Sequence, residues 1–168
     1  MTISLTGPES SGKSTLSKWL ASEYNLPLIN EYAREYLREK GRNYSFDDVI
    51  KIGLEQNRRI NKLKSKNITF VSDTDLLVII VWLEDKFNTV PDEIIQSFIK
   101  AKADCYFLCY PDIQWEDDAL REDPLRRIEI FDIYVKYLER FNCNYHVIKG
   151  DFTQRQDKMK EVVAESGL

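Results

Sequence analysis

The sequence predicts an α/β fold in which a five-stranded parallel sheet carries helices on both faces, giving three layers and a lid segment. Three observations predict it. Short apolar runs alternate with longer amphipathic stretches, turn residues separate them, and a glycine-rich loop joins the first run to the first stretch. Such alternation is typical of βαβ units with parallel strands. A chain of 168 residues is expected to form one domain over 1–168.

The first half of the chain is expected to hold three strands and three helices. Their order is strand 1–6, helix 13–24, strand 26–29, helix 31–40, helix 46–65 and strand 68–71. Each strand is a short apolar run, and each helix has apolar residues at helical spacing. Gly41 ends the second helix, because glycine closes helices readily. Ser45 precedes the third helix, where its hydroxyl can cap the free amides of the first turn.

The second half is expected to continue the alternation. Its order is helix 75–87, helix 91–102, strand 105–109, an irregular polar segment, helix 126–141, strand 145–148 and helix 153–165. The apolar run 75–87 fits strand or helix by periodicity alone, and we predict a helix because parallel strands need a crossover there. Pro91 followed by two acidic residues is typical of a helix start. Neighbouring parallel strands are then joined by right-handed crossovers.

Composition excludes several classes of protein. A net charge of −4 gives no electrostatic basis for binding nucleic acid or an anionic membrane. The longest apolar run, 76–83, is far shorter than the ~20 residues of a membrane-spanning helix. The three cysteines lack zinc-site spacing, so Cys105 and Cys109 are expected to be buried free thiols in a reducing cytoplasm. His146 is the only histidine, which leaves no catalytic triad. Met1 leads directly into the first strand, so we expect no signal peptide.

Residues 7–14 (GPESSGKS) match the phosphate-loop pattern G-x-x-x-x-G-K-[ST] between a predicted strand and a predicted helix. Gly7 and Gly12 let the backbone fold tightly around a phosphate, towards which amides and the helix N-terminus point. Lys13 can reach the β- and γ-phosphates, and the Ser14 hydroxyl can ligate Mg²⁺. The alternative is an accidental glycine-rich turn, which the flanking strand and helix disfavour.

Carboxylates follow the second and third strands, and ligands of parallel sheets bind beyond such strand ends. Asp73 is expected to hold Mg²⁺ directly or through water, with a helix N-cap as the alternative. Asp75 fits either a helix cap or a hydrogen bond to substrate hydroxyls. Glu31 is our first choice, and Asp73 our second, for the carboxylate that accepts or orients an alcohol proton. The alternative for Glu31 is a first-turn residue favoured by the helix dipole.

Two neighbours of Glu31 and one loop complete the candidate site. Arg34 lies one turn beyond Glu31 and is expected to pair with it or to contact a phosphate. Tyr32 fits either stacking on a ring or packing in the core. Residues 111–127 form a long polar segment that we interpret as a lid, with a solvated loop as the alternative. A lid arginine can stabilise a transferring phosphoryl group, and Trp115 suits packing on a ligand or anchoring the lid.

Four motifs occur in order over almost the whole chain: GPESSGKSTL, EYAREYL, VSDTD and W-x-x-D-x-x-R. Together they resemble the ribosylnicotinamide kinase domain of NadR-type proteins. The resemblance implies a P-loop kinase fold of the nucleoside-kinase type, with ATP and Mg²⁺ as cofactors. It also implies transfer of the γ-phosphoryl group to the ribose 5′-hydroxyl of nicotinamide riboside, giving nicotinamide mononucleotide.

The resemblance and the strand-end positions together define the expected site residues. The nucleotide is expected to contact Gly7, Glu9, Ser10, Ser11, Gly12, Lys13, Ser14, Thr15, Arg126 and Arg127. The substrate is expected to contact Glu31, Tyr32, Arg34, Asp73, Asp75, Trp115 and Asp118. The expected catalytic residues are Lys13, Glu31, Asp73 and Arg121, and the expected metal ligands are Ser14 and Asp73.

Other functions stay open at this point. The lid reads D-D-A-L-R where the family pattern is D-G-x-R, which leaves the lid contacts unsettled. One alternative is a kinase of another nucleoside or small alcohol, and another is a regulatory ATPase that acts through a protein partner. A guanine-reading N-K-x-D motif is disfavoured, because Lys64 stands where its carboxylate is required. We expect a small-molecule substrate, with neither nucleic acid nor membrane as partner, and the oligomeric state is left open.

Overall fold

The computed structural model describes residues 1–41, 43–117 and 121–167. Its elements, in chain order, are β1 (Thr2–Thr6), α1 (Lys13–Glu23), β2 (Leu28–Ile29), α2 (Tyr32–Lys40), α3 (Phe46–Lys64), β3 (Phe70–Asp73), α4 (Leu76–Phe87), α5 (Asp92–Ala101), β4 (Cys105–Cys109), α6 (Arg127–Arg140), β5 (Tyr145–Ile148) and α7 (Phe152–Glu165). Every strand and helix that the sequence predicts is present. The predicted α/β fold is confirmed.

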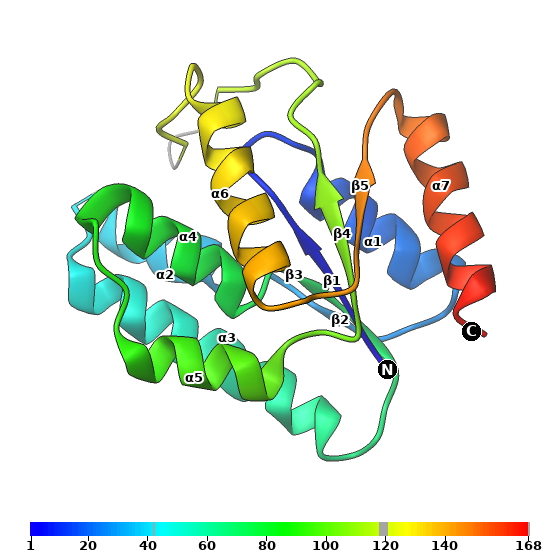
Figure 1. Cartoon of the computed structure of the whole chain (residues 1–168), viewed down its shortest axis with the longest axis horizontal. Helices are drawn as coiled ribbons and strands as arrows, with labels where there is room; N and C mark the ends of the chain where they lie inside the picture. The colour runs from blue at the N-terminus through cyan, green and yellow to red at the C-terminus, as the bar shows by residue number, and fades with distance from the viewer. Residues whose placement is uncertain (42, 118–120, 168) are drawn as a thin grey trace.

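The five strands form one parallel sheet in the order β2-β3-β1-β4-β5 (Figure 1). β1 lies at the centre, so that Leu5 is beside Asp73 of β3 on one side and Phe107 of β4 on the other. After β1 the chain forms β2 and β3, which lie on one flank of β1 within the sheet, and then β4 and β5, which lie on its other flank. This reversal places the loop after β1 at the point where open parallel sheets bind ligands.

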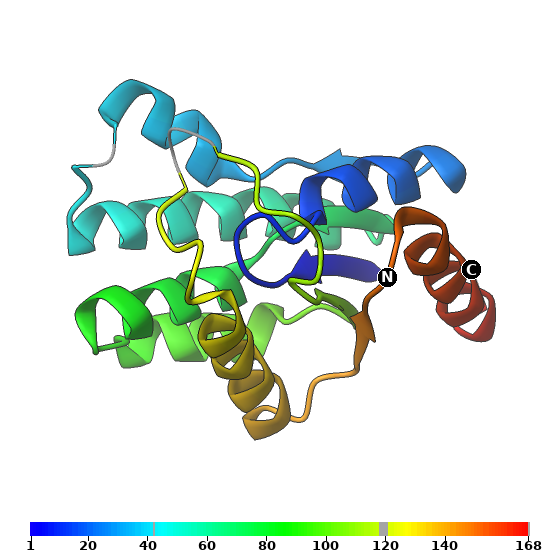
Figure 2. The same ribbon diagram turned by 90° about the horizontal axis from the view of Figure 1, so that it is seen from above.

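Helices cover both faces of the sheet, and the alternation along β4 shows which helices cover which face. Cys105, Phe107 and Cys109 pack in the core formed with α1 and α7. Tyr106 and Leu108 point the other way, into the larger core formed with α2 to α6. Figures 1 and 2 show the two helical layers on either side of the strands. The three predicted layers are therefore present.

Element boundaries differ from the prediction mainly at β2 and β3. β2 contains only Leu28 and Ile29, whereas β3 extends to Asp73 because it stays paired with β1 as far as Leu5. The ambiguous apolar run forms α4, which confirms the predicted helix. Asp75 caps it, because its Oδ1 accepts a hydrogen bond of 2.9 Å from the amide of Leu77.

Cys105 and Cys109 are free and buried, as predicted. Burial raises the pKa of the Cys105 thiol to about 11 and that of Cys109 to about 12. Thiols of this kind stay protonated and act as small apolar side chains. Across the described ranges, the helices are too short or too polar to cross a bilayer.

Candidate active site

The phosphate loop fills the turn between β1 and α1 and lies tightly against the end of β4. Gly7 has φ 131° and Gly12 has φ 86°, values that L side chains rarely adopt. A Cβ atom on Gly7 would lie 2.6 Å from the carbonyl oxygen of Cys109. Any side chain at Gly7 would therefore push the loop away from the sheet. Only glycine allows this approach.

Lys13 closes the loop from inside. Its Nζ donates hydrogen bonds of 2.9 Å to the Gly7 carbonyl and 2.7 Å to the Pro8 carbonyl. The Ser11 hydroxyl donates to the same Pro8 carbonyl at 2.7 Å. Gly12 is the N-cap of α1 and has no side chain to occupy the first-turn amides. Backbone amides and one ammonium therefore surround a position suited to a phosphate group.

Two carboxylates lie beside Lys13, as the strand-end argument predicts. Asp73 is only 4% exposed, and its Oδ1 is buried without a hydrogen-bond partner among the described residues. Burial raises the pKa of Asp73, and a hydrogen bond from Ser14 together with the charge of Lys13 only partly offsets this. An uncompensated carboxylate oxygen in such a place is costly unless a ligand completes it.

Glu31 precedes α2, and its side chain is 18% exposed. Arg34 Nε donates to Glu31 Oε2 at 3.3 Å, which is the predicted pairing. Burial raises the pKa of Glu31, and the neighbouring charge of Asp73 raises it further. Lys13 and Arg34 oppose the shift without cancelling it. A carboxylate with a raised pKa is a better proton acceptor at neutral pH than an ordinary one.

The residues around the loop fit a magnesium ion. Mg²⁺ is normally held by one or two carboxylates together with phosphate oxygens and water. The orphaned Oδ1 of Asp73 and the adjacent hydroxyl of Ser14 supply the protein side of such a site. The described residues contain no cluster of three or more His, Cys, Asp or Glu side chains that would hold a cation unaided.

A cavity of about 240 Å³ opens from the phosphate loop and reaches between α2, α4 and α6. It is lined by Gly7 to Thr15, by Glu31, Ala33, Arg34 and Leu37, by Tyr44, by Val78, Val81, Trp82, Asp85 and Lys86, by Ile113, Glu116, Arg121, Glu122 and Asp123, and by Ile130 and Tyr134. The residues of the phosphate loop, Glu31, Arg34 and Arg121 were predicted. The wall from α4 and the aromatic side chain of Tyr44 were not.

Tyr44 and Trp82 form the aromatic part of that wall. Their rings meet edge to face with centroids 4.8 Å apart, and Trp82 Nε1 donates to the Tyr44 hydroxyl at 3.0 Å. The Tyr44 hydroxyl in turn donates to Glu122 at 2.9 Å. The sequence carried little signal for either residue, because Trp82 lies in an almost wholly apolar run and Tyr44 in a short turn.

The described parts of the lid segment, residues 111–117 and 121–127, lie beside the phosphate loop (Figure 2). The amide of Glu122 donates to Glu9 at 2.8 Å, and Arg121 Nη1 lies 3.4 Å from the Ser10 hydroxyl. Lys86 of α4 holds Asp123 through a hydrogen bond of 2.5 Å. The described part of this segment therefore contacts both the loop and the cavity wall. Residues 118–120 lie outside the described structure, so the expected substrate contact of Asp118 falls outside it as well.

Two of the predicted substrate contacts, Asp75 and Tyr32, lie outside the cavity lining. Asp75 is 5% exposed and caps α4 through one oxygen, while the other accepts from the Tyr106 hydroxyl at 2.7 Å. Both oxygens are thus occupied, and the geometry corresponds to the helix-cap alternative. Tyr32 does not line the cavity, and the Arg59 guanidinium lies 4.5 Å from its ring centroid. Tyr32 packs against the core cluster, which corresponds to the second of its two predicted roles.

The remaining lid residues support the loop from outside. Arg127 donates to the carbonyls of Ser10 and Ile113 at 3.2 and 3.0 Å, and its guanidinium lies 5.8 Å from the ring centroid of Trp115. Arg126 pairs with Asp85 at 2.6 Å instead of facing the loop, so a direct phosphate contact would need that pair to open. Trp115 anchors the segment, which is one of its two predicted roles.

Comparison with known proteins places these features in a wider group. A family profile described as AAA domain (AAA_28) matches residues 2–155. The trifunctional NAD biosynthesis/regulator protein NadR of Salmonella typhimurium (strain LT2) is 27% identical over 180 residues, covering 99% of this chain and 43% of NadR. NadR of Escherichia coli (strain K12) is 28% identical over 174 residues, covering 98% of this chain and 42% of NadR. The chain thus spans less than half the length of these curated relatives.

Solved structures agree on the fold. A crystal structure of NadR protein in complex with NR has a TM-score of 0.83 and 21% identity, covering 99% of this chain and 52% of that one. Deoxyadenosine kinase from M. mycoides, with products bound, has a TM-score of 0.70 and 15% identity, covering 98% and 100%. The fold is therefore shared with nucleoside kinases. Since the family profile covers almost the entire chain, the protein belongs to the AAA_28 family of AAA domains.

Proposed function

We propose that the chain is an ATP- and Mg²⁺-dependent kinase that phosphorylates the ribose 5′-hydroxyl of nicotinamide riboside to give nicotinamide mononucleotide. The observation that carries this proposal is the convergence of Glu31 and Asp73 on Lys13 at the phosphate loop, next to an open cavity. The resemblance to NadR over almost the whole chain supports it. So do the NadR complexes with NR and with NAD and AMP-PNP.

The reacting groups fit transfer of a phosphoryl group to an alcohol. The raised pKa of Glu31 suits it to accept the proton of a hydroxyl group in the cavity. Lys13, held in the loop by two carbonyls, can exchange them for phosphate oxygens. Mg²⁺, when held by Ser14 and Asp73, supplies charge neutralisation at the phosphates. The lid segment excludes water, which limits wasteful hydrolysis.

The cavity favours a cationic ring on the acceptor. Its lining carboxylates are Glu9, Glu31, Asp85, Glu116, Glu122 and Asp123, and its lining cations are Lys13, Arg34, Lys86 and Arg121. The carboxylates outnumber the cations among the lining residues, and the apolar and aromatic side chains of α4 form part of the wall. The pyridinium ring of nicotinamide riboside is planar and positively charged, so both features suit it.

Purified protein, ATP and Mg²⁺ with a panel of acceptors test the proposal. The panel contains nicotinamide riboside, its neutral reduced form, deoxyadenosine, thymidine and thymidylate, and product is identified by mass. We expect the highest kcat/KM with nicotinamide riboside and a lower value with its uncharged form. Lys13→Ala should abolish turnover while leaving the fold intact, since Lys13 lies at the mouth of the loop.

Two alternatives have distinct outcomes in the same assay. Preference for another acceptor would assign the chain to a different nucleoside or small alcohol, in keeping with the deoxyadenosine kinase likeness of the fold. Normal ATP binding without phosphorylation of any acceptor would end the kinase proposal and favour a regulatory ATPase that acts through a protein partner. The buried free thiols agree with a cytoplasmic location for either activity.

A further inference from the structure

Arg155 of α7 is a charged side chain that is only 2% exposed, and it lies directly beneath the phosphate loop. Its Nε donates to the Gly150 carbonyl at 2.8 Å, its Nη1 to the Ser11 carbonyl at 2.8 Å, and its Nη2 to the Tyr110 carbonyl at 2.9 Å. Its charge is paired with Asp112. The guanidinium therefore joins three backbone segments and one carboxylate.

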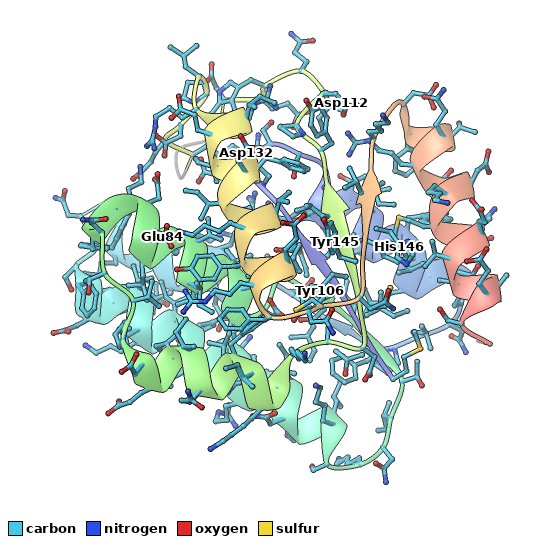
Figure 3. All side chains as sticks on the ribbon, in the orientation of Figure 1. Glu84, Tyr106, Asp112, Asp132, Tyr145 and His146 are labelled. Carbon is cyan, nitrogen blue, oxygen red and sulfur yellow. The ribbon has the colours of Figure 1, made fainter. Side chains whose placement is uncertain are left out.

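These partners come from separate parts of the fold. Tyr110 and Asp112 follow β4, Gly150 follows β5, and Ser11 belongs to the phosphate loop. Figure 3 shows Asp112 beyond the end of β4. Asp112 also accepts a hydrogen bond of 2.7 Å from the Gly150 amide. The Arg155 side chain is buried but that of Asp112 is 29% exposed, so solvent weakens the ion pair, and the contacts of Arg155 with the loop call for an explanation beyond stability.

The contact with Ser11 fixes the direction of one peptide unit. The Ser11 carbonyl and the Gly12 N–H belong to the same planar trans peptide, so they point in opposite directions. Because Arg155 draws the carbonyl inward, the Gly12 N–H faces outward, to the mouth of the loop. Gly12 lacks a Cβ atom and has φ 86°, so the backbone itself would allow this peptide to turn over. Arg155 prevents this.

We propose that Arg155 is a positioning residue for the nucleotide: it locks the Ser11–Gly12 peptide so that the Gly12 amide is presented to the phosphates. This inference depends on the proposed nucleotide-dependent function. Arg155 itself touches no phosphate, because its nitrogens are engaged with Ser11, Tyr110, Gly150 and Asp112 on the inner side of the loop. Sequence reasoning missed it because its partners lie up to 144 positions away in the chain.

Arg155→Lys tests the inference, since it keeps the charge and removes the three-way fork. ADP is the probe, and its Kd is measured by calorimetry on protein shown by circular dichroism to be folded. We expect Kd for ADP to rise about 10- to 100-fold, which is the effect of one hydrogen bond to a charged group. KM for the riboside, which Arg155 does not reach because Arg155 lines no part of the cavity, should change less than twofold.

Lys64→Met is the control for loss of stability alone. Lys64 Nζ also donates to two carbonyls, those of Ala101 and Lys102, both 2.8 Å away and remote from the loop. It should lower Tm without changing Kd for ADP. If Arg155→Lys does not fold, Arg155→Met replaces it, because it removes the donor and leaves the Asp112 carboxylate in contact with solvent. The same rise in Kd is expected.

The outcomes separate this inference from the proposed function. A folded Arg155 variant that binds ADP within twofold of the wild type overturns the inference and leaves the kinase proposal untouched. A wild-type protein that binds ADP but phosphorylates no acceptor overturns the kinase proposal, and the effect of Arg155 on ADP binding can still be measured. Equal loss of ADP affinity in Lys64→Met would also overturn the inference, because stability alone would then explain it.

Discussion

Asp48 and Asp73 are both almost fully buried, yet their surroundings differ completely. Asp48 accepts hydrogen bonds from the Tyr36 hydroxyl, the Lys40 ammonium, and both the amide and hydroxyl of Ser45. These donors hold the pKa of Asp48 far below its usual range. Asp73 has one oxygen without a partner among the described residues, and burial raises its pKa.

The difference separates a structural carboxylate from a functional one. Asp48 joins the end of α2 to the start of α3 and completes a capping box with Ser45. Its hydrogen-bonding capacity is used within the fold. Asp73 keeps unused capacity beside the phosphate loop, together with its neighbour Glu31. Proteins tolerate such uncompensated groups chiefly where a ligand completes them, so activity there is gained at some cost in stability.

The largest expected effect comes from Glu31→Gln. Loss of the proton acceptor should lower kcat by roughly 10²–10⁴-fold. Steady-state rates with saturating riboside measure this effect. Glu35→Gln is the matched control, because Glu35 lies on the same helix, pairs with Arg59 at the surface and faces no reacting group. A change confined to KM in Glu31→Gln would instead assign Glu31 to substrate positioning.

Asp73→Asn should lower kcat about 100-fold or more, because metal-assisted charge stabilisation is worth several kcal/mol. The loss should be partly recovered at raised Mg²⁺ concentration, which a titration of rate against Mg²⁺ would show. Tm of the ligand-free protein should rise, since the uncompensated charge is removed. A lower Tm with unchanged kcat would place Asp73 in the same class as Asp48.

Asp48→Asn should show the reverse pattern. It removes the charge that four donors stabilise, so Tm should fall by several degrees. The rate constant kcat should stay within about twofold of the wild type, because the donors around Asp48 come from α2 and the N-cap of α3 and none belongs to the phosphate loop. Thermal melts and steady-state rates measure the two quantities. A large loss of kcat in correctly folded protein would contradict the division between the two carboxylates.

The smallest expected effect is the pH dependence of stability. The folded-state pKa of Glu31 is raised, so the folded protein binds more protons than the unfolded chain and gains stability as pH falls. Glu31→Gln should therefore raise Tm at neutral pH, because it removes a charge that burial disfavours. That gain should vanish near about pH 4, close to the ordinary Glu pKa.

The contribution of Asp48 to stability depends on pH in the opposite direction. Its folded-state pKa is lowered, so its stabilising effect is complete above the ordinary Asp pKa and is lost only as pH falls through the folded-state value. The Tm deficit of Asp48→Asn should therefore largely persist at about pH 4. Thermal melts of Glu31→Gln, Asp48→Asn and the wild type between neutral pH and about pH 4 would test both predictions. Parallel curves for the two variants would contradict it.

The fold could be predicted because its signals are local. The apolar runs and caps that define each element lie within a few residues of one another, and the rule for parallel sheets then brings Glu31 and Asp73 to the phosphate loop. The position of Asp73 at the end of an apolar run was sufficient to predict it as a site residue. That Asp73 pairs with β1, directly beside the phosphate loop, follows only from the strand order in the fold.

The rest of the site depends on which side of an element faces the cavity. Residues 76–83 are uniformly apolar, so periodicity could not assign Trp82 to the cavity wall, nor Asp85 three positions further on. Arg155 did leave a signal. It lies on the apolar stripe of α7 with Met159, Val162 and Val163, where a buried arginine requires carbonyl or carboxylate partners. Those partners could not be identified without the fold.

The contacts between the lid segment and the phosphate loop have a kinetic consequence. Glu122 is bound to Glu9, and Arg121 lies against Ser10, so a nucleotide that contacts Glu9 and Ser10, as proposed, would have to displace both. The observed association rate would then level off at high nucleotide concentration, at the frequency with which the segment lifts. The loop beneath it is already folded, and the transfer of Lys13 from the Gly7 and Pro8 carbonyls to phosphate oxygens needs only a fast side-chain rotation, so the lifting would limit how fast the protein loads.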